Sequence, residues 1–279
     1  MTSKKSNTRL AEIACAMRQA HGLDITPFDE AFLLKALDKR LEDAGLGNAA
    51  DYLSRLRENP VEAGIFFNSL NISYSEFFRN PLTFAVLEQM VLPALAGKKD
   101  GRAELRVWSA GCASGQEAYS VAILLAELSA GRDVPLNFRI FATDISETVL
   151  AAARAGVYDA EAVKNLRVDH LNKYFKKRGC TYELSSEIKN RVDFSVHDLM
   201  NAGLSCPPHA IYGDFDLVLC GNLLFYYKPE VRQGILGKIA GSLRPKGFFV
   251  TGEAETEIAD RSGYFRPVAA PAAVFQKFG

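Results

Sequence analysis

One stretch, Arg106-Val-Trp-Ser-Ala-Gly-Cys-Ala-Ser-Gly-Gln-Glu-Ala-Tyr119, decides the fold. It predicts a buried strand over 105–110, then a turn carrying Gly111 and Gly115, and then a helix over 115–130. Further along, Arg139-Ile-Phe-Ala-Thr-Asp144 predicts a second strand that ends in an acid. In a nucleotide-binding β-α-β unit, an acid at the end of the second strand can accept two hydrogen bonds from a ribose diol. Together the two segments indicate a bound nucleoside.

The charge of the turn distinguishes two classes of nucleoside. A dinucleotide site requires the spacing Gly-x-Gly-x-x-Gly, so that a pyrophosphate can bind at the helix N-terminus. The segment Gly111-Cys-Ala-Ser-Gly115 lacks this spacing, and the carboxylate of Glu117 in the first helical turn would repel phosphate. A carboxylate favours a cation, and S-adenosylmethionine carries an ammonium and a sulfonium but no phosphate. The sequence therefore favours S-adenosylmethionine over NAD, and a turn that binds no ligand is the remaining alternative.

Composition argues against several classes of protein. The chain has 279 residues, and its 33 basic and 33 acidic side chains give a formal charge of zero, which argues against non-specific nucleic-acid binding. No apolar run is long enough to span a membrane. The five cysteines form no Cys-x-x-Cys pair and the four histidines are scattered. We therefore expect no metal site and a reducing, cytoplasmic location.

Hydrophobic periodicity divides the chain into two parts. Residues 1–96 predict a helical N-terminal domain, in which Thr26-Pro27, Asn48 and Asn80-Pro81 mark helix starts. After a polar linker at 97–101, strands and helices alternate as in a mostly parallel sheet, which makes 97–279 the second domain. The predicted strands are 105–110, 137–143, 191–196, 214–220 and 247–252, the predicted helices are 115–130, 146–155, 161–176 and 229–243, and 263–278 predicts a closing hairpin.

Several segments, in order along the chain, resemble motifs of the CheR family of chemotaxis protein-glutamate O-methyltransferases. They are Asn71-Ile-Ser-Tyr-Ser-Glu-Phe-Phe-Arg-Asn-Pro81, the turn at 109–120, Phe141-Ala-Thr-Asp-Ile-Ser146, Ala153-Arg-Ala-Gly-Val-Tyr158, Cys220-Gly-Asn-Leu-Leu-Phe-Tyr-Tyr227, and Leu243-Arg-Pro-Lys-Gly-Phe-Phe249 with Gly252-Glu-Ala-Glu255. The resemblance implies an α/β fold, in which a Rossmann-like class I methyltransferase sheet follows a small all-helical N-terminal domain.

The same resemblance implies an activity and a site. Members of the family transfer a methyl group from S-adenosyl-L-methionine to glutamates on the cytoplasmic helices of chemoreceptors, which yields glutamyl methyl esters and S-adenosyl-L-homocysteine. Neither nucleic-acid binding nor membrane insertion is implied. Carried over residue by residue, the cofactor site consists of Ser73, Ser75, Arg79, Gly111, Glu117, Asp144, Asp198, Leu199, Gly221 and Asn222. Tyr226 and Arg79 fall on catalytic positions: Tyr226 faces the reacting carboxylate, and Arg79 pairs with the carboxylate of either cofactor or substrate.

The chain departs from the family pattern where Ser73 replaces Asn, Gln116 replaces Glu, Ala118 replaces Pro and Gly221 replaces Arg. The change at Gly221 removes a guanidinium beside the cofactor; either Arg79 compensates or cofactor affinity is lower. Two further hypotheses stay open: a non-catalytic regulatory module that binds S-adenosylmethionine, and a methyltransferase with another substrate. The short segment 179–191 either forms a small β insert that touches the receptor or merely connects its neighbours.

Overall fold

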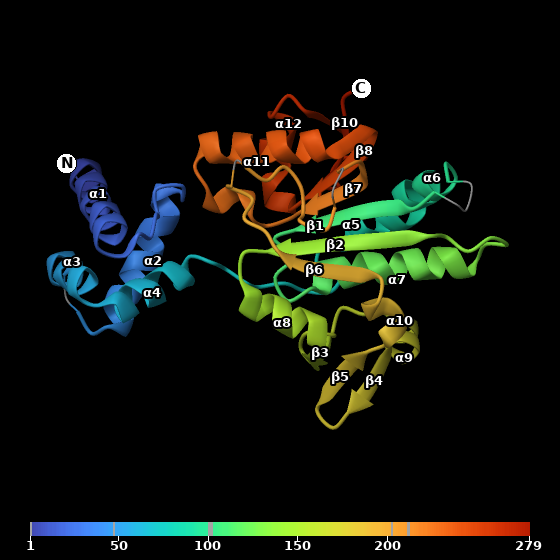
Figure 1. Cartoon of the computed structure of the whole chain (residues 1–279), viewed down its shortest axis with the longest axis horizontal. Helices are drawn as coiled ribbons and strands as arrows, with labels where there is room; N and C mark the ends of the chain where they lie inside the picture. The colour runs from blue at the N-terminus through green and yellow to red at the C-terminus, as the bar shows by residue number, and fades with distance from the viewer. Residues whose placement is uncertain (1, 47, 100–102, 202, 211–212) are drawn as a thin grey trace. The chain divides into compact units, whose positions relative to one another are not determined.

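A computed structural model describes residues 2–46, 48–99, 103–201, 203–210 and 213–279 of the chain (Figure 1). The chain forms two compact units. The first, the helical unit, comprises residues 1–72 and 225–232, and the second, the sheet unit, comprises 73–224 and 233–279. Of the predicted linker at 97–101, residues 100 and 101 lie outside the described ranges. Within those ranges, no helix is both long and apolar enough to cross a membrane.

Four helices form most of the helical unit: α1 (Thr2–His21), α2 (Glu30–Asp43), α3 (Ala49–Glu58) and α4 (Pro60–Ser69). Their apolar faces meet in a core that includes Ile13, Met17, Leu37, Leu56 and Phe66. The prediction that Asn48 starts a helix is confirmed, since its side chain accepts hydrogen bonds from the first N–H groups of α3.

The predicted helix start at Thr26-Pro27 is wrong. Helix α2 begins at Glu30, and Asp29 caps it by accepting hydrogen bonds from two N–H groups of the first turn. The Thr26 hydroxyl instead donates to Asp24, at 2.7 Å. Aspartate caps a helix at least as well as threonine, so the local sequence offered two starts and the later one formed.

Residues 225–232 complete the helical unit although they lie far from it in the sequence. They span the end of the 3₁₀ helix η2 (Leu224–Tyr226) and the start of α11 (Pro229–Ser242). Tyr227 stacks on Phe28 with ring centroids 5.2 Å apart, and the Asp29 N–H donates to the Tyr226 carbonyl at 2.8 Å. The core of this unit is therefore built from two separate stretches of chain.

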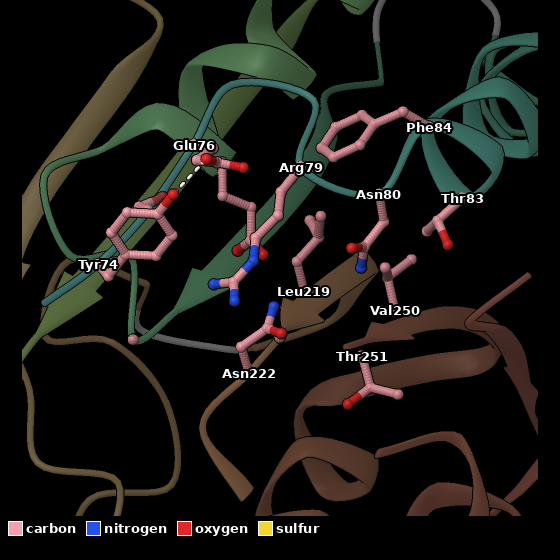
Figure 2. Close-up of a pocket in the computed structure, with 14 residues that line it drawn as sticks. Tyr74, Glu76, Arg79, Asn80, Thr83, Phe84, Leu219, Asn222, Val250 and Thr251 are labelled. Atoms are coloured by element: carbon pink, nitrogen blue, oxygen red, sulfur yellow. Dashed lines mark hydrogen bonds between the residues drawn. The ribbon is translucent and has the colours of Figure 1, made fainter. Parts of the chain in front are cut away.

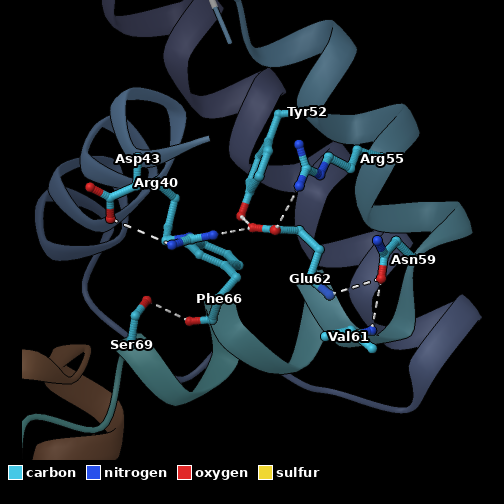
Figure 3. A network of polar contacts seen from close by, with 9 residues as sticks. All are labelled: Arg40, Asp43, Tyr52, Arg55, Asn59, Val61, Glu62, Phe66 and Ser69. Atoms are coloured by element: carbon cyan, nitrogen blue, oxygen red, sulfur yellow. Dashed lines mark hydrogen bonds and ion pairs between the residues drawn. The ribbon is translucent and has the colours of Figure 1, made fainter. Parts of the chain in front are cut away.

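A buried carboxylate joins three helices of the helical unit (Figure 3). Glu62 on α4 is 3% exposed and accepts hydrogen bonds from Arg40 on α2, at 2.6 Å, and from the Tyr52 hydroxyl on α3, at 2.9 Å. The Arg55 guanidinium lies 3.4 Å from its other oxygen. Burial alone raises the pKa of Glu62, but these hydrogen bonds and the two arginine charges outweigh burial and lower the pKa below its ordinary value.

The sheet unit is built on a seven-stranded sheet with the order β6-β2-β1-β7-β8-β10-β9. Its strands are β1 (Leu105–Ala110), β2 (Phe138–Asp144), β6 (Val192–Val196), β7 (Phe215–Cys220), β8 (Leu243–Thr251), β9 (Phe265–Pro267) and β10 (Val274–Lys277). The neighbouring strands β6, β2, β1, β7 and β8 run parallel to one another, and β10 pairs antiparallel with β8 and β9. The predicted core strands, the closing hairpin and the class I sheet with a small helical domain are confirmed.

Helices α7 (Gln116–Ala130) and α11 cover opposite faces of this sheet, and α8 (Glu147–Ala155) lies on the side of α7 (Figure 1). Successive side chains along β1 point to opposite faces of the sheet, so the strand contributes to the core on both faces. Val107 packs into the core that α7 shares, whereas Trp108 contacts Phe215 and His197 with ring centroids 5.6 and 5.7 Å apart. The short elements η3 (Glu253–Glu255) and α12 (Thr256–Asp260) follow β8.

The division between the units falls at 72/73, earlier than the expected 96/97. The intervening helices are α5 (Pro81–Val86), the π-helix η1 (Leu87–Val91) and α6 (Leu92–Ala96). They place Phe84, Leu87 and Leu95 in the core of the sheet unit. Helical periodicity alone cannot tell which core a helix joins, and here the apolar face packs against the sheet.

The predicted helix over 161–176 is confirmed only over α9 (Val168–Tyr174). Residues 161–167 before it are not helical, and after it the chain forms β4 (Phe175–Arg178). A three-stranded antiparallel sheet pairs β5 (Thr181–Leu184) with both β4 and β3 (Val157–Asp159), and α10 (Ser186–Lys189) follows. The β insert is therefore larger than the expected 179–191. A tight turn at Gly179, with φ of 59°, lets the lysine-rich segment pair with β5 instead of continuing the helix.

Replacing Glu62 with Gln should destabilise the protein, because Arg40 then loses its buried anionic partner. We expect a loss of about 1–3 kcal/mol in the free energy of unfolding at pH 7, measured by urea denaturation. The folded pKa of Glu62 lies below the ordinary 4.5, so this stabilisation is present above pH 4.5 and is lost as the pH falls through the folded pKa. The difference in the free energy of unfolding between wild type and Glu62→Gln should therefore disappear at acidic pH.

Asp43→Asn is the matched control for this prediction. Asp43 also pairs with Arg40, at 3.4 Å, but its side chain is 49% exposed. An exposed pair of this kind contributes about 0.2–1 kcal/mol. Equal losses from the two substitutions would show that the burial of Glu62 is not what matters.

Candidate functional site

The turn after β1 is fixed by hydrogen bonds to the neighbouring strand. The N–H groups of Gly111 and Cys112 both donate to the Thr143 carbonyl, at 2.8 and 2.9 Å. Gly115, at the start of α7, has φ of 88°, and a Cβ there would lie 3.1 Å from Ala153 and 3.2 Å from the Phe194 ring. Glycine is therefore required at 115. The turn lies across the carboxyl ends of β1 and β2, which is where ligands bind in open α/β sheets.

Asp144 ends β2 and holds this turn. One carboxylate oxygen accepts a hydrogen bond from the Ala113 N–H, and the other accepts one from the Ser146 N–H, both at 3.0 Å. Burial raises the pKa of Asp144, and the bonds from Ser146 and Ala113 oppose the rise. A carboxylate has about four acceptor positions, so two backbone bonds leave capacity for a ligand. Asp144 therefore both shapes the turn and presents an acceptor beside it.

Glu117 is a poorly compensated acid in the first turn of α7. The Ser109 hydroxyl donates to it at 2.7 Å, and no other hydrogen bond to its carboxylate is found among the described residues. Burial raises the pKa of Glu117 to about 7; the nearby Glu255 adds to the rise, while the Ser109 hydrogen bond and the Arg79 charge oppose it. A cation placed beside Glu117 would restore its ordinary ionisation. The side chain is thus suited to an ammonium group.

A pocket opens at this edge of the sheet unit (Figure 2). It brings together six of the predicted site residues: Ser75, Arg79, Gly111, Glu117, Gly221 and Asn222. Arg79 points into it from the segment before α5, and Asn222 lies opposite, after β7. The wall is completed by residues that the sequence did not single out, namely Tyr74, Glu76, Asn80, Thr83, Phe84, Leu219, Val250 and Thr251.

Two signals could have found part of that wall. Leu219, Val250 and Thr251 lie near or at the carboxyl ends of the parallel strands β7 and β8, where ligands of such sheets bind. Tyr74 and Glu76 alternate with Ser73 and Ser75 in the motif that supplies Arg79. The sequence predicts Asn80 as a helix start, and it does precede Pro81 of α5, but its side chain makes no capping hydrogen bond.

Gly221 and Asn222 lie beside a buried acid, Glu255. The Asn222 N–H donates to the Glu255 carboxylate at 2.8 Å, and the same oxygen accepts from Thr251 and Gly252 at 2.8 and 3.0 Å. A Cβ on Gly221 would lie 3.2 Å from the Glu117 carboxylate. A side chain at position 221 would therefore extend beside Glu117, at the place where the family pattern has an arginine.

Four predicted cofactor residues do not line this pocket. Ser73 is exposed. Asp144 lies at the turn, as described above, and Asp198 and Leu199 follow β6, where Asp198 accepts a hydrogen bond from the Met200 N–H at 2.8 Å. The predicted catalytic Tyr226 belongs to the helical unit, where its ring packs on Phe32 with centroids 4.7 Å apart.

Binding of S-adenosylhomocysteine, which carries an ammonium, should release a proton from Glu117. The empty protein holds Glu117 with a pKa of about 7, so at pH 6 most of these side chains are protonated. An ammonium beside the carboxylate favours its ionised form, so affinity should rise as the pH increases from about 5.5 to 8. Calorimetry at pH 6 in buffers of different ionisation enthalpy measures the release, and Glu117→Gln should abolish it. An affinity that does not depend on pH in wild type would contradict the assignment.

Comparison with known proteins identifies the family. The family model "CheR methyltransferase, SAM binding domain" matches residues 73–274. "Chemotaxis protein methyltransferase 1" of Pseudomonas aeruginosa is 34% identical over 230 residues, which is 78% of this chain and 79% of that one. The chemotaxis protein methyltransferase of Escherichia coli is 30% identical over 256 residues, 90% of this chain and 85% of that one. The chain therefore belongs to the CheR methyltransferase family and carries its S-adenosylmethionine-binding domain.

Proposed function

We propose that this protein methylates glutamate side chains on the cytoplasmic helices of chemoreceptors. Membership of the CheR family supports a methyltransferase, and relatives named as chemotaxis methyltransferases support a chemoreceptor as substrate. The observation that supports the cofactor most directly is the presence of Arg79 and Glu117 in one pocket. The methionine end of S-adenosylmethionine carries one carboxylate and one ammonium, and these two side chains provide the opposite charges. The proposed reaction takes place in the cytoplasm, where such helices lie.

Each proposed binding residue has a role that suits its surroundings. Glu117 would bind the ammonium, Arg79 the carboxylate of the cofactor or of the substrate, and Asp144 the ribose diol. Asp198 and Leu199 would border the adenine, because they follow β6 beside β2 in the sheet. Backbone and small side chains of Ser73, Ser75, Gly111, Gly221 and Asn222 would surround the remainder.

The chemistry asks little of the protein beyond positioning. When bound, S-adenosylmethionine supplies an electrophilic methyl group on its sulfonium. A glutamate side chain ionises near pH 4.3 in peptides, so the acceptor is already a carboxylate at neutral pH and needs no general base. The protein must instead orient that carboxylate and keep water away from it, and positioning of this kind can contribute about 7–11 kcal/mol. We propose that the Tyr226 hydroxyl helps to orient the acceptor.

Gly221 favours a second candidate. Without the guanidinium of the family pattern, Arg79 is the one positive charge that acts on Glu117 among the described residues. A protein with this change could bind the cofactor and regulate a partner without methylating it. Alternatively, the change adapts the pocket to a different methyl acceptor.

A methylation assay distinguishes these candidates. Purified protein, a chemoreceptor cytoplasmic fragment and S-adenosylmethionine with a radiolabelled methyl group should give labelled receptor, and the label should be released by mild base because it is an ester. Binding of S-adenosylhomocysteine without any base-labile label would favour the regulatory module. Label that resists base would favour a different acceptor. Gly221→Arg serves as the matched variant: it should bind cofactor at least as tightly as wild type if the glycine is a simple loss.

Tyr226→Phe tests the orienting hydroxyl. The ring stays, so its packing on Phe32 and the affinity for S-adenosylhomocysteine should hold. A hydrogen bond to a charged group in the transition state contributes about 1.5–3 kcal/mol, so turnover at saturating cofactor should fall roughly ten- to a hundredfold. Tyr227→Phe is the control, because that ring stacks on Phe28 in the same unit. Equal turnover in wild type and Tyr226→Phe would remove Tyr226 from the mechanism.

A further inference from the structure

The segment that carries Arg79 is anchored firmly inside the sheet unit. Phe77 is fully buried and makes edge contacts with Tyr158 and Phe175, at centroid distances of 4.9 and 5.5 Å. The N–H of the next residue, Phe78, donates to the Ser120 hydroxyl on α7 at 3.1 Å. Two neighbours of these anchors, Tyr74 and Glu76, line the cofactor pocket. The core therefore fixes the backbone immediately after Glu76 and immediately before Arg79.

Arg79 itself has little that fixes its side chain. No ion pair of Arg79 with a carboxylate is found within the described ranges, and Arg79 acts on Glu117 through its charge at longer range. A long arginine side chain loses rotamer entropy when it is immobilised. An arginine that must be ordered on binding a ligand carboxylate therefore contributes less to affinity. A contact that holds the Arg79 guanidinium in place before the ligand binds would therefore raise the affinity.

The Tyr74 ring provides that contact. The guanidinium carbon of Arg79 lies 5.3 Å from the centroid of the ring, within the range of a cation–π interaction (Figure 2). The Tyr74 side chain is 60% exposed, so it contributes little to the core, and its presence at the pocket needs another reason. Its face is turned to the one cation of the pocket wall among the described residues.

Glu76 holds the ring in turn. The Tyr74 hydroxyl donates to the Glu76 carboxylate, as the dashed line in Figure 2 marks. Glu76 also lies near two residues that precede α9: Asn165 donates to it at 3.5 Å, and the Lys164 ammonium lies 3.9 Å away. These contacts occupy Glu76, which otherwise would be an acid free to pair with Arg79 and neutralise it.

We propose that Tyr74 is a positioning residue: its ring holds the Arg79 guanidinium ready for the carboxylate of S-adenosylmethionine, and Glu76 holds the ring. This inference rests on the proposed cofactor site and deepens it. The pair lines a pocket that lacks the arginine expected at Gly221.

A double-mutant cycle on cofactor affinity tests the proposal. The dissociation constant of S-adenosylhomocysteine is measured by calorimetry for wild type, Tyr74→Leu, Arg79→Met and the double variant. Tyr74→Leu should weaken binding about two- to fivefold, the range of an exposed cation–π contact. In the Arg79→Met background, the same substitution should cause no further loss. Tyr74→Phe keeps the ring and should stay within about twofold of wild type.

The outcomes separate clearly. An unchanged affinity in Tyr74→Leu, or an equal loss with and without Arg79, overturns the proposal. Tyr182→Leu is the matched control, since Lys177 lies 5.8 Å from that ring in the small sheet, and it should leave the affinity unchanged. Thermal melting checks that each variant folds. Because the readout is binding, a receptor that is never methylated would refute the proposed reaction but leave this inference intact, whereas a wild type that fails to bind S-adenosylhomocysteine would refute both.

Discussion

The carbonyl oxygen of Thr143 accepts two hydrogen bonds that fix the glycine turn after β1, and the site depends on the position of that turn. Two successive N–H groups of the glycine turn donate to it, so the turn cannot move without breaking its link to β2. The same strand ends in Asp144, which receives the next N–H of the turn, that of Ala113. The parallel register of β1 with β2 therefore places an acid, a glycine turn and the first turn of α7 together. The positions of Glu117 and the pocket follow from that register.

Two acids in this region, the buried Glu255 and the partly exposed Glu117, differ in what surrounds them. Glu255 receives three hydrogen bonds at one oxygen, from Asn222, Thr251 and Gly252, and so acts as a structural link between the ends of β7 and β8. Glu117 has one hydrogen bond, from a serine hydroxyl. Burying a charge with so few partners is unfavourable, and proteins retain such a group where a ligand can supply the missing charge. The contrast explains why only one of the two acids is suited to bind a ligand.

Much of the fold could be predicted from the sequence because parallel strands such as 215–220 are short apolar runs with clear ends. Predictions failed where two local choices had similar energies. Asp29 and Thr26 both could cap a helix, and the segment after Tyr174 is as compatible with a strand as with a helix. The cofactor residues near the glycine turn followed from motif spacing. The roles of Tyr74 and Glu76 could not be predicted from the sequence, since they depend on which side chains lie beside Arg79 in three dimensions.

The return of residues 225–232 to the helical unit has a consequence for how the chain is made. Helices α1 to α4 leave the ribosome first, but their core lacks Tyr226 and Tyr227 until more than two hundred residues have been synthesised. Contacts between such distant parts of a chain form slowly, because the intervening loop must close first. The N-terminal helices are therefore exposed with an incomplete core during synthesis. Neither unit is therefore formed by one continuous stretch of sequence.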